Sequence, residues 1–290
     1  GTIKMTQGKY CREVLERFQM EECHSKNTPL PGNFRLRRKD EGDQEPTNLP
    51  YRQLVGSMMY LSTCTRPDIS YGLGVLTQRF DSPTAETFGA AKMMLRYLQG
   101  TQDQGIEYTR TSTQLVAYVD SDWAGDRDTR RSTTGYVVMF CGGAISWRSG
   151  LQKSPAGSST EAEYIALAEL TKELLYLRRI AGDLGCEQVG ATEVFVDNEA
   201  AIKIANNAYS ARRLRHVEIA WHISRHAIKE GKLKLTKIPS NDNPADVFTN
   251  PLAFPAFRRH RDAIMVSGGK AGGSPQEGVR GAVNPPPPTA

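Results

Sequence analysis

One stretch of the chain, Leu115–Asp126, constrains the possible fold more than any other. It reads LVAYVDSDWAGD, in which five apolar residues run without a break into Asp120. A short run that is apolar at every position predicts a strand buried on both faces of a sheet. Asp120 then lies at the carboxyl end of that strand, which is the edge where open α/β sheets usually place their chemistry.

A second segment repeats this arrangement. Val194-Phe195-Val196 runs directly into Asp197, and a long helical pattern separates the two runs. Strands joined by such a helical crossover pair in parallel, so we predict that Asp120 and Asp197 lie side by side at one sheet edge. Two neighbouring buried carboxylates repel each other and raise each other's pKa, and a divalent cation would relieve that cost.

The pattern after residue 110 predicts an α/β sheet with helices packed on it. Gly142-Gly143 lies between two of the strands and predicts a hairpin. The expected strands are 115–120, 133–140, 144–147, 193–197 and 232–238, and the expected helices are 159–184, 198–206, 212–230 and one that starts near Pro244. The first hundred residues predict mainly helices, at 6–22, 51–63, 68–80 and 83–98, with a polar linker at 25–50.

The long helix that begins in SSTEAEYIAL supplies a third acid. Leucines at three- and four-residue spacing mark its core face, and Glu163 lies only about 40° from Leu167 on that face. Glu163 should therefore sit near the strand ends. Glu161 lies about 120° away and is expected to face solvent and to serve as a capping partner after Ser158. The alternative for Glu163 is that it caps the helix through Thr160, at the same spacing.

Asp246, in NDNPADVF, is the fourth acid. Asn243 is a plausible N-cap with Pro244 at the first helical position, so Asp246 can also be interpreted as an ordinary partner of the helix dipole. If it joins the other three, the cluster holds only carboxylates. Such a cluster selects hard ions, Mg²⁺ or Mn²⁺, and can hold two of them to act on a phosphodiester.

Several motifs in a fixed order resemble the ribonuclease H domain of copia-type LTR retrotransposon Pol polyproteins. They are YVDSDWAGDRDTRRSTTGYVV, SSTEAEYIAL, VFVDNEAAI and NPADVFT. Upstream, MTQGKYCREVLERFQMEECHSKNTP and YRQLVGSMMYLSTCTRPDISYGLGVL resemble the segment that follows the polymerase palm, so the resemblance covers about residues 3–262. The polymerase motif Tyr-x-Asp-Asp has no counterpart here, which implies the carboxy-terminal part of a Pol polyprotein without polymerase activity.

The resemblance implies a fold, an activity and a site. The fold is α/β, a ribonuclease H-like five-stranded mixed sheet with flanking helices, preceded by a mainly helical thumb- or connection-like segment. The implied activity is hydrolysis of the RNA strand of RNA–DNA hybrids with two Mg²⁺ (or Mn²⁺) ions. By motif, the implied catalytic and metal-binding acids are Asp120, Glu163, Asp197 and Asp246. The implied partners are the hybrid and the rest of the reverse transcriptase, in a cytoplasmic particle or the nucleus.

This interpretation divides the chain into a helical unit at 1–110, a ribonuclease H-like domain at 113–262 and a disordered Gly- and Pro-rich tail at 266–290. Two departures from the family pattern bear on the site. Pro155 and Gly157 stand where strand-compatible residues are expected, which predicts a shortened third strand. After NPAD the family often has Thr-Lys, where this chain has Thr249-Asn250.

The formal net charge of +5 is concentrated between Arg212 and Lys237, a stretch that contains eight Lys and Arg residues but only two Glu residues. This stretch favours a polyanion, and we predict nucleic-acid contacts by Arg212, Arg213, Arg215 and His216. The alternative is a solvated helix face followed by a Lys-fringed edge strand.

Other classes have less support. No apolar run approaches 18 residues, so no membrane span is expected, and five scattered Cys without a CxxC indicate a reducing compartment. A zinc hydrolase would rest on His222 and His226 alone, without HExxH. The chief alternative is a non-catalytic nucleic-acid-binding remnant of a retrotransposon polyprotein, which keeps the fold but has lost turnover.

Overall fold

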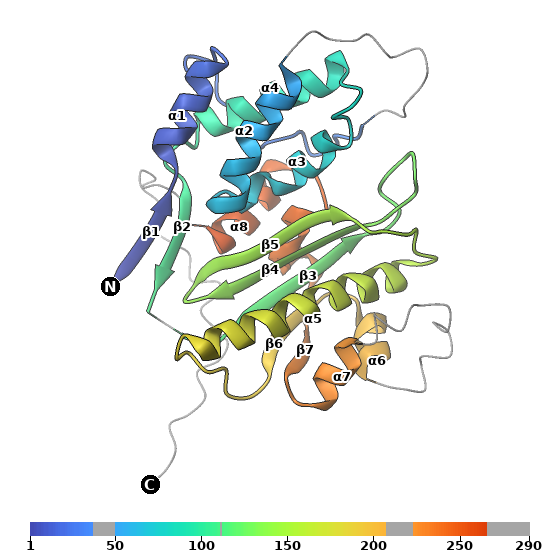
Figure 1. The fold of residues 1–290 in the computed structure, drawn as a ribbon. Coiled ribbons are helices and arrows are strands. Elements are labelled where there is room, and N and C mark those ends of the chain that lie inside the picture. The colour runs from blue at the N-terminus through green and yellow to red at the C-terminus, as the bar shows by residue number, and fades with distance from the viewer. Residues whose placement is uncertain (37–49, 111, 207–222, 266–290) are drawn as a thin grey trace.

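The structure is a computed structural model, and it describes residues 1–36, 50–110, 112–206 and 223–265. Figure 1 shows its helices and strands. The strands are β1 Thr2–Thr6, β2 Gly105–Thr109, β3 Val116–Asp122, β4 Thr133–Phe140, β5 Gly143–Leu151, β6 Thr192–Val196 and β7 Leu233–Lys237. The α-helices are α1 Gly8–Arg17, α2 Tyr51–Cys64, α3 Ser70–Thr77, α4 Ala85–Gln99, α5 Ser159–Asp183, α6 Glu199–Asn206, α7 Ile223–Lys229 and α8 Phe254–Ile264. Short 3₁₀ helices are η2 Pro67–Ile69, η5 Ser240–Asp242 and η6 Pro244–Phe248.

The main sheet has five strands in the order β5-β4-β3-β6-β7. β4 is antiparallel to both of its neighbours, β3 and β5, whereas β6 is parallel to β3 and β7 is parallel to β6. The predicted five-stranded mixed sheet is therefore confirmed. Val119 and Val196 are the last pair of the parallel register, so the residues that follow them, Asp120 and Asp197, lie next to each other. β6 ends there, whereas β3 continues to Asp122 alongside β4.

The two faces of the sheet are covered by different parts of the chain (Figure 1). Side chains alternate along β4: Tyr136 and Val138 join the core beneath α5, whereas Val137 joins the core beneath the amino-terminal helices. The second core also takes in Phe248 of η6 and Phe257 of α8. The amino-terminal helices thus pack on the sheet together with the carboxy-terminal helix. The division at 1–110 and 113–262 stays a prediction.

Helix α5 spans Ser159–Asp183, close to its predicted bounds, and places its leucine stripe against the sheet. Ser158 is the N-cap, and its hydroxyl accepts the backbone N–H of Glu161 at 3.2 Å. The expectation that Glu161 faces solvent is wrong, because this side chain is only 6% exposed. Its carboxylate turns back to accept the backbone N–H of Gly157 at 3.1 Å, which satisfies a donor in the loop before the helix.

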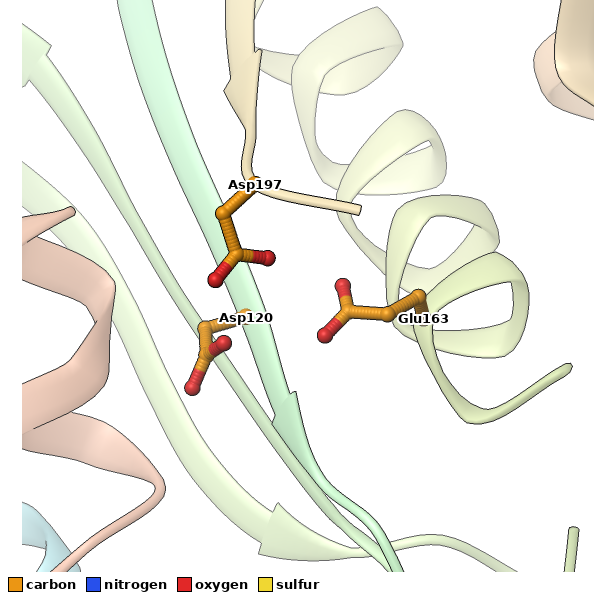
Figure 2. A group of neighbouring side chains, drawn as sticks. All are labelled: Asp120, Glu163 and Asp197. Atoms are coloured by element: carbon orange, nitrogen blue, oxygen red, sulfur yellow. The ribbon is translucent and has the colours of Figure 1, made fainter. Parts of the chain in front are cut away.

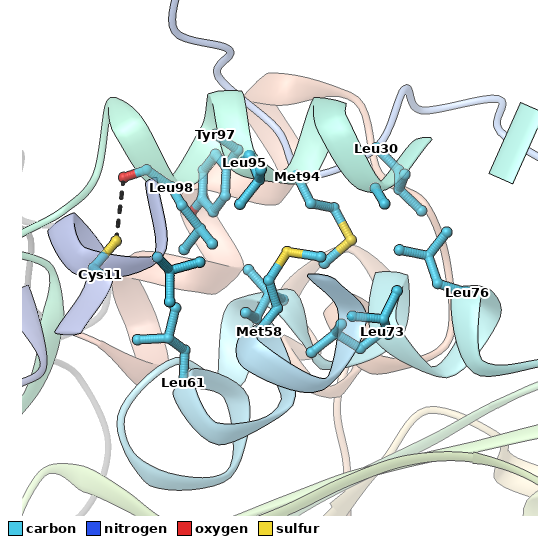
Figure 3. Close-up of a cluster of buried hydrophobic side chains, with 14 of the residues drawn as sticks. Cys11, Leu30, Met58, Leu61, Leu73, Leu76, Met94, Leu95, Tyr97 and Leu98 are labelled. Atoms are coloured by element: carbon cyan, nitrogen blue, oxygen red, sulfur yellow. Dashed lines mark hydrogen bonds between the residues drawn. The ribbon is translucent and has the colours of Figure 1, made fainter. Parts of the chain in front are cut away.

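The amino-terminal helices enclose a second apolar core, part of which Figure 3 shows. Met58 of α2 and Met94 of α4 are both fully buried there. Next to this core, Arg66 and Asp68 form a two-pronged ion pair at 3.0 and 2.9 Å, and the hydroxyl of Tyr97 donates to the same carboxylate. Both charged side chains are at most 1% exposed, so each charge depends on its partner.

Several predicted elements differ from the structure. β1 and β2 form an antiparallel ribbon that was not predicted, and the first helix begins only at Gly8. In β1, Ile3 and Met5 alternate with polar residues as in a half-buried strand, but the strand is only five residues long and all five are exposed. The helix predicted at 83–98 begins later, with Thr84 as its N-cap. The helix expected near Pro244 is the 3₁₀ helix η6, and α8 follows separately.

The third strand of the sheet, β5, is longer than predicted. It continues to Leu151, and Pro155 and Gly157 lie in the loop after it, so they do not shorten the paired strand. Of the helix predicted at 212–230, the structure describes only α7; Arg212, Arg213, Arg215 and His216 lie outside the described residues, as does the tail at 266–290. Among the helices that the structure describes, none has the length and apolar character needed to cross a membrane.

Candidate active site

Three carboxylates converge at the edge of the sheet where β3 and β6 end. Figure 2 shows Asp120 on β3, Asp197 directly after β6 and Glu163 on α5, with their carboxylates pointing toward one another. One oxygen from each lies within 4.8 Å of the others. The parallel register of β3 and β6 aligns the two aspartates, and the helical phase of α5 brings Glu163 to them, which is the arrangement that the sequence predicted.

Glu163 is held by the residue next to Asp120. Its Oε1 accepts hydrogen bonds from the backbone N–H of Ser121 at 3.0 Å and from the Ser121 hydroxyl at 3.1 Å. Its Oε2 is buried and has no hydrogen-bond partner among the described residues. A buried carboxylate oxygen without a donor is costly, and a bound cation would satisfy it. The alternative in which Glu163 caps its own helix is not what the structure shows, because Ser121 takes its Oε1.

Asp120 is positioned by a residue that lies far from it in the sequence. The hydroxyl of Thr249 donates to Asp120 Oδ2. This contact requires the segment around η6 to lie almost against β4, and Gly135 permits it: a Cβ at that position would lie 2.5 Å from the Thr249 methyl and 2.9 Å from Cβ of Phe248. In the sequence, Thr249 stands out only as a neighbour of the NPAD motif, and no local signal marks its hydroxyl as part of the site.

Asp246 lies at the rim of this cluster. Asn243 caps η6 as predicted, and its amide also donates to the carbonyl of Val119 at 2.9 Å, which ties η6 to β3. Asp246 Oδ1 accepts the amide of Asn250 at 2.8 Å. Asp246 does not belong to the group of three oxygens within 4.8 Å, but its charge is close enough to raise the pKa of Asp120.

The carboxylates raise one another's pKa values in the metal-free protein. Burial, followed by the charges of Asp246 and Asp197, raises the pKa of Asp120 to about 7. Burial, followed by the charges of Asp120 and Asp197, raises the pKa of Glu163 well above its ordinary value. Burial and then the charge of Asp197 raise the pKa of Asp246. The site therefore needs either protons or cations to be stable near neutral pH.

The donor set fits hard divalent ions. Every converging ligand is a carboxylate oxygen, which suits Mg²⁺ or Mn²⁺ and not zinc. Within the part of the chain that the structure describes, this is the one group of three or more His, Cys, Asp or Glu side chains that could hold a metal. The zinc alternative finds no support there: His226 is exposed and pairs with Glu230 at 3.0 Å, and His222 lies outside the described residues.

The sheet order, the mixed strand directions and the acidic strand ends define a ribonuclease H-like fold. Among solved structures, the chain is similar to LC11-RNase H1 isolated from compost, at 19% identity and a TM-score of 0.34, over 50% of this chain and 99% of that one. The comparison with protein-family models finds no match.

Curated relatives place the chain in a family. It is 40% identical over 252 residues to the retrovirus-related Pol polyprotein from transposon TNT 1-94 of Nicotiana tabacum, covering 84% of this chain and 19% of that protein. It is 35% identical to the corresponding polyprotein from transposon RE2 of Arabidopsis thaliana, covering 91% of this chain and 18% of that protein. The chain belongs to the copia-type retrotransposon Pol polyproteins, and it spans about a fifth of the length of these two relatives.

A shorter relative matches the chain over a smaller region. The secreted RxLR effector protein 161 of Plasmopara viticola is 50% identical over 131 residues, which cover 45% of this chain and 92% of that protein.

Proposed function

We propose that this chain is a retrotransposon-type ribonuclease H that hydrolyses the RNA strand of RNA–DNA hybrids with two Mg²⁺ or Mn²⁺ ions. The observation that carries the proposal is the convergence of Asp120, Glu163 and Asp197, where none of the described residues donates a hydrogen bond to the buried Oε2 of Glu163. The family and the ribonuclease H-like fold support the choice of substrate.

The proposed roles follow from how each side chain is held. Asp120, fixed by Thr249, and Asp197 would hold the ions through their carboxylate oxygens. Glu163 would bind through the oxygen that Ser121 leaves open. Asp246, at the rim, would contribute a further carboxylate to the site. When bound, such ions activate a water molecule and stabilise the leaving oxygen, so that water adds to phosphorus as the phosphorus–oxygen bond of the RNA strand breaks.

The setting of this activity is also a proposal. The partners would be an RNA–DNA hybrid and the rest of the reverse transcriptase of a parent polyprotein, in a cytoplasmic particle or the nucleus. Arg212, Arg213, Arg215 and His216 would contact nucleic-acid phosphates.

A strand-specific cleavage assay tests the proposal. The full chain is incubated with a hybrid labelled separately on each strand, with Mg²⁺, with Mn²⁺ or with EDTA, beside Asp197→Asn and a control, Asp183→Asn, which changes an exposed acid at the far end of α5. We expect cleavage of the RNA strand alone, abolished by EDTA and by Asp197→Asn but not by Asp183→Asn. Cleavage that survives in Asp197→Asn would indicate a contaminant. Hybrid binding without cleavage in either metal would favour the non-catalytic remnant.

A further inference from the structure

A short segment between α1 and α2 connects the amino-terminal helices with the region around the carboxylates. It consists of residues 29–36, which we call the strap. Leu30 anchors the strap, because its side chain is 4% exposed and belongs to the amino-terminal core, beside Met94 (Figure 3). Phe34 packs against the same core. The position of the strap is therefore set by the helices of the first hundred residues.

The middle of the strap lies directly against the backbone that follows η6. A Cβ at Gly32 would lie 2.8 Å from the backbone nitrogen of Ala253 and 3.0 Å from its Cα, so only glycine fits there without a shift. The obstacle is backbone and not the end of a flexible side chain. Leu30 and Asn250 also line one cavity. The strap thus packs on residues 250–253.

The residues just before this contact orient carboxylates of the site. The hydroxyl of Thr249 donates to Asp120, and the amide of Asn250 donates to Asp246 Oδ1 at 2.8 Å and to the Thr249 hydroxyl at 3.2 Å. The next residue, Pro251, is buried, and its ring restricts the backbone there. A displacement of the segment after Pro251 is therefore passed back to Thr249.

The carboxyl end of the strap reaches the strand that carries Asp120. Arg35 lines a cavity together with Asp122, the last residue of β3, and with Tyr71 of α3. The strap is therefore held between the amino-terminal core at one end and the end of β3 at the other. Along its length it meets the two parts of the chain whose contact positions Asp120.

From these contacts we infer that the strap is a positioning element for the carboxylate site. By holding residues 250–253 in place it fixes Thr249 and so orients Asp120, with Asn250 and Asp246 beside them. The affinity of the site for divalent metal then depends on where the amino-terminal helices hold the strap. The inference rests on the proposed function, because it concerns the same carboxylates, and it gives the amino-terminal part of the chain a role in the site.

The test measures metal binding and hybrid cleavage separately. Isothermal titration calorimetry with Mn²⁺ gives the affinity of the full chain, of Gly32→Ala and of Leu30→Ala. Gly56→Ala is the control for the first variant, because a Cβ at Gly56 in α2 would meet nothing within 4 Å. Leu61→Ala is the control for the second, because Leu61 is buried in the same core but lies well apart from Leu30 (Figure 3). Urea denaturation measures the stability of each variant.

We expect Gly32→Ala to bind Mn²⁺ about fivefold more weakly, an effect typical of residues that act on a site through packed contacts, and Gly56→Ala to bind as the unmodified chain does. Leu30→Ala should weaken binding by a similar factor. Leu61→Ala removes an equally buried side chain and should lose stability without losing affinity. Because Gly32 is exposed, Gly32→Ala keeps the test usable if Leu30→Ala does not fold.

A double-mutant cycle checks that the strap acts through Thr249. In a chain that already carries Thr249→Val, Gly32→Ala should weaken Mn²⁺ binding by less than about twofold, because the hydroxyl that the strap positions is absent. A general loss of packing would not depend on that hydroxyl. The same fivefold loss in both backgrounds would therefore overturn the inference.

The remaining outcomes separate the inference from the proposed function. If Gly32→Ala and Leu30→Ala bind Mn²⁺ as the unmodified chain does, or if Leu61→Ala is weakened as much as Leu30→Ala, the role of the strap is overturned and the proposed function stands. If both strap variants bind more weakly but the full chain cleaves no hybrid in Mg²⁺ or Mn²⁺, the strap is supported and the proposed catalysis is overturned. If the full chain binds no divalent metal, both are overturned.

Discussion

Thr249 donates its hydroxyl hydrogen to the carboxylate of Asp120, a residue 129 positions earlier in the chain. The bond joins the segment after η6 to the end of β3, so the geometry of the carboxylate cluster depends on a contact between distant parts of the sequence. It also favours the charged form of Asp120, against the burial that raises its pKa.

Thr249→Val should weaken metal binding. Without the hydroxyl, Asp120 loses a donor that lowers its pKa, so more of the protein carries a proton there at pH 7 and the carboxylate is less well oriented. We expect roughly tenfold weaker Mn²⁺ binding by isothermal titration calorimetry, in the range typical of residues that orient metal ligands. Thr249→Ser keeps the donor and should bind as the unmodified chain does. Equal affinity in all three proteins would contradict the orienting role.

The metal-free protein should lose stability as pH rises from about 4 to about 7. Asp120 and Glu163 have raised pKa values in the folded state, so the folded protein holds protons that the unfolded chain releases once the pH exceeds the ordinary carboxyl range. Their contribution is therefore lost as pH rises through their folded pKa values. Thermal melts in EDTA across this range measure the effect. Asp120→Asn should flatten the dependence, and a slope unchanged in that variant would contradict this origin.

Gly135→Ala should destabilise the fold. The added Cβ would meet the Thr249 methyl, Cβ of Phe248 and the Ala245 carbonyl at 2.5, 2.9 and 3.1 Å, so η6 must move away from β4. We expect a loss of about 1–3 kcal/mol in the free energy of unfolding, measured by urea denaturation. Gly182→Ala is the matched control, because its Cβ would meet nothing within 4 Å in α5. That variant should be unchanged or slightly more stable.

Asp68→Asn should be among the most damaging changes outside the site. It leaves the guanidinium of Arg66 buried without a counter-charge, which costs about 3–5 kcal/mol when one member of a buried pair is removed. Chemical denaturation measures the loss. The exposed pair Arg12–Asp103 provides the comparison, and Asp103→Asn should change stability by less than about 1 kcal/mol. Similar losses of stability in the two variants would show that burial does not determine how much an ion pair contributes to stability.

Local patterns in the sequence predicted most of the main sheet and the meeting of three acids. Apolar runs that end in Asp located β3 and β6, and the leucine spacing of α5 placed Glu163 on the correct face. The ribbon β1–β2 was missed because both strands are only five residues long and β1 is exposed throughout, although Ile106 of β2 joins the amino-terminal core. The prediction that Glu161 faces solvent was wrong because the backbone N–H of a residue in the preceding loop holds its carboxylate. Helical spacing alone does not predict such a contact.

The features of the site that the sequence did not predict are contacts between segments far apart in the chain. No spacing in the sequence connects Thr249 with Asp120, or Asn243 with the carbonyl of Val119. The catalytic and metal-binding roles of the four acids stay predictions.

The core shared by the first helices and α8 has a consequence for synthesis. The ring of Tyr97 in α4 packs edge-on against Phe257 in α8, with centroids 5.6 Å apart. A ribosome releases α4 long before α8, so the apolar surface around Tyr97 stays open to water until the chain has been made past residue 257. During that interval the nascent chain is exposed to aggregation and to chaperones. A transcript truncated before Phe254 should therefore yield an aggregating product, even though every residue of the carboxylate cluster has already been translated.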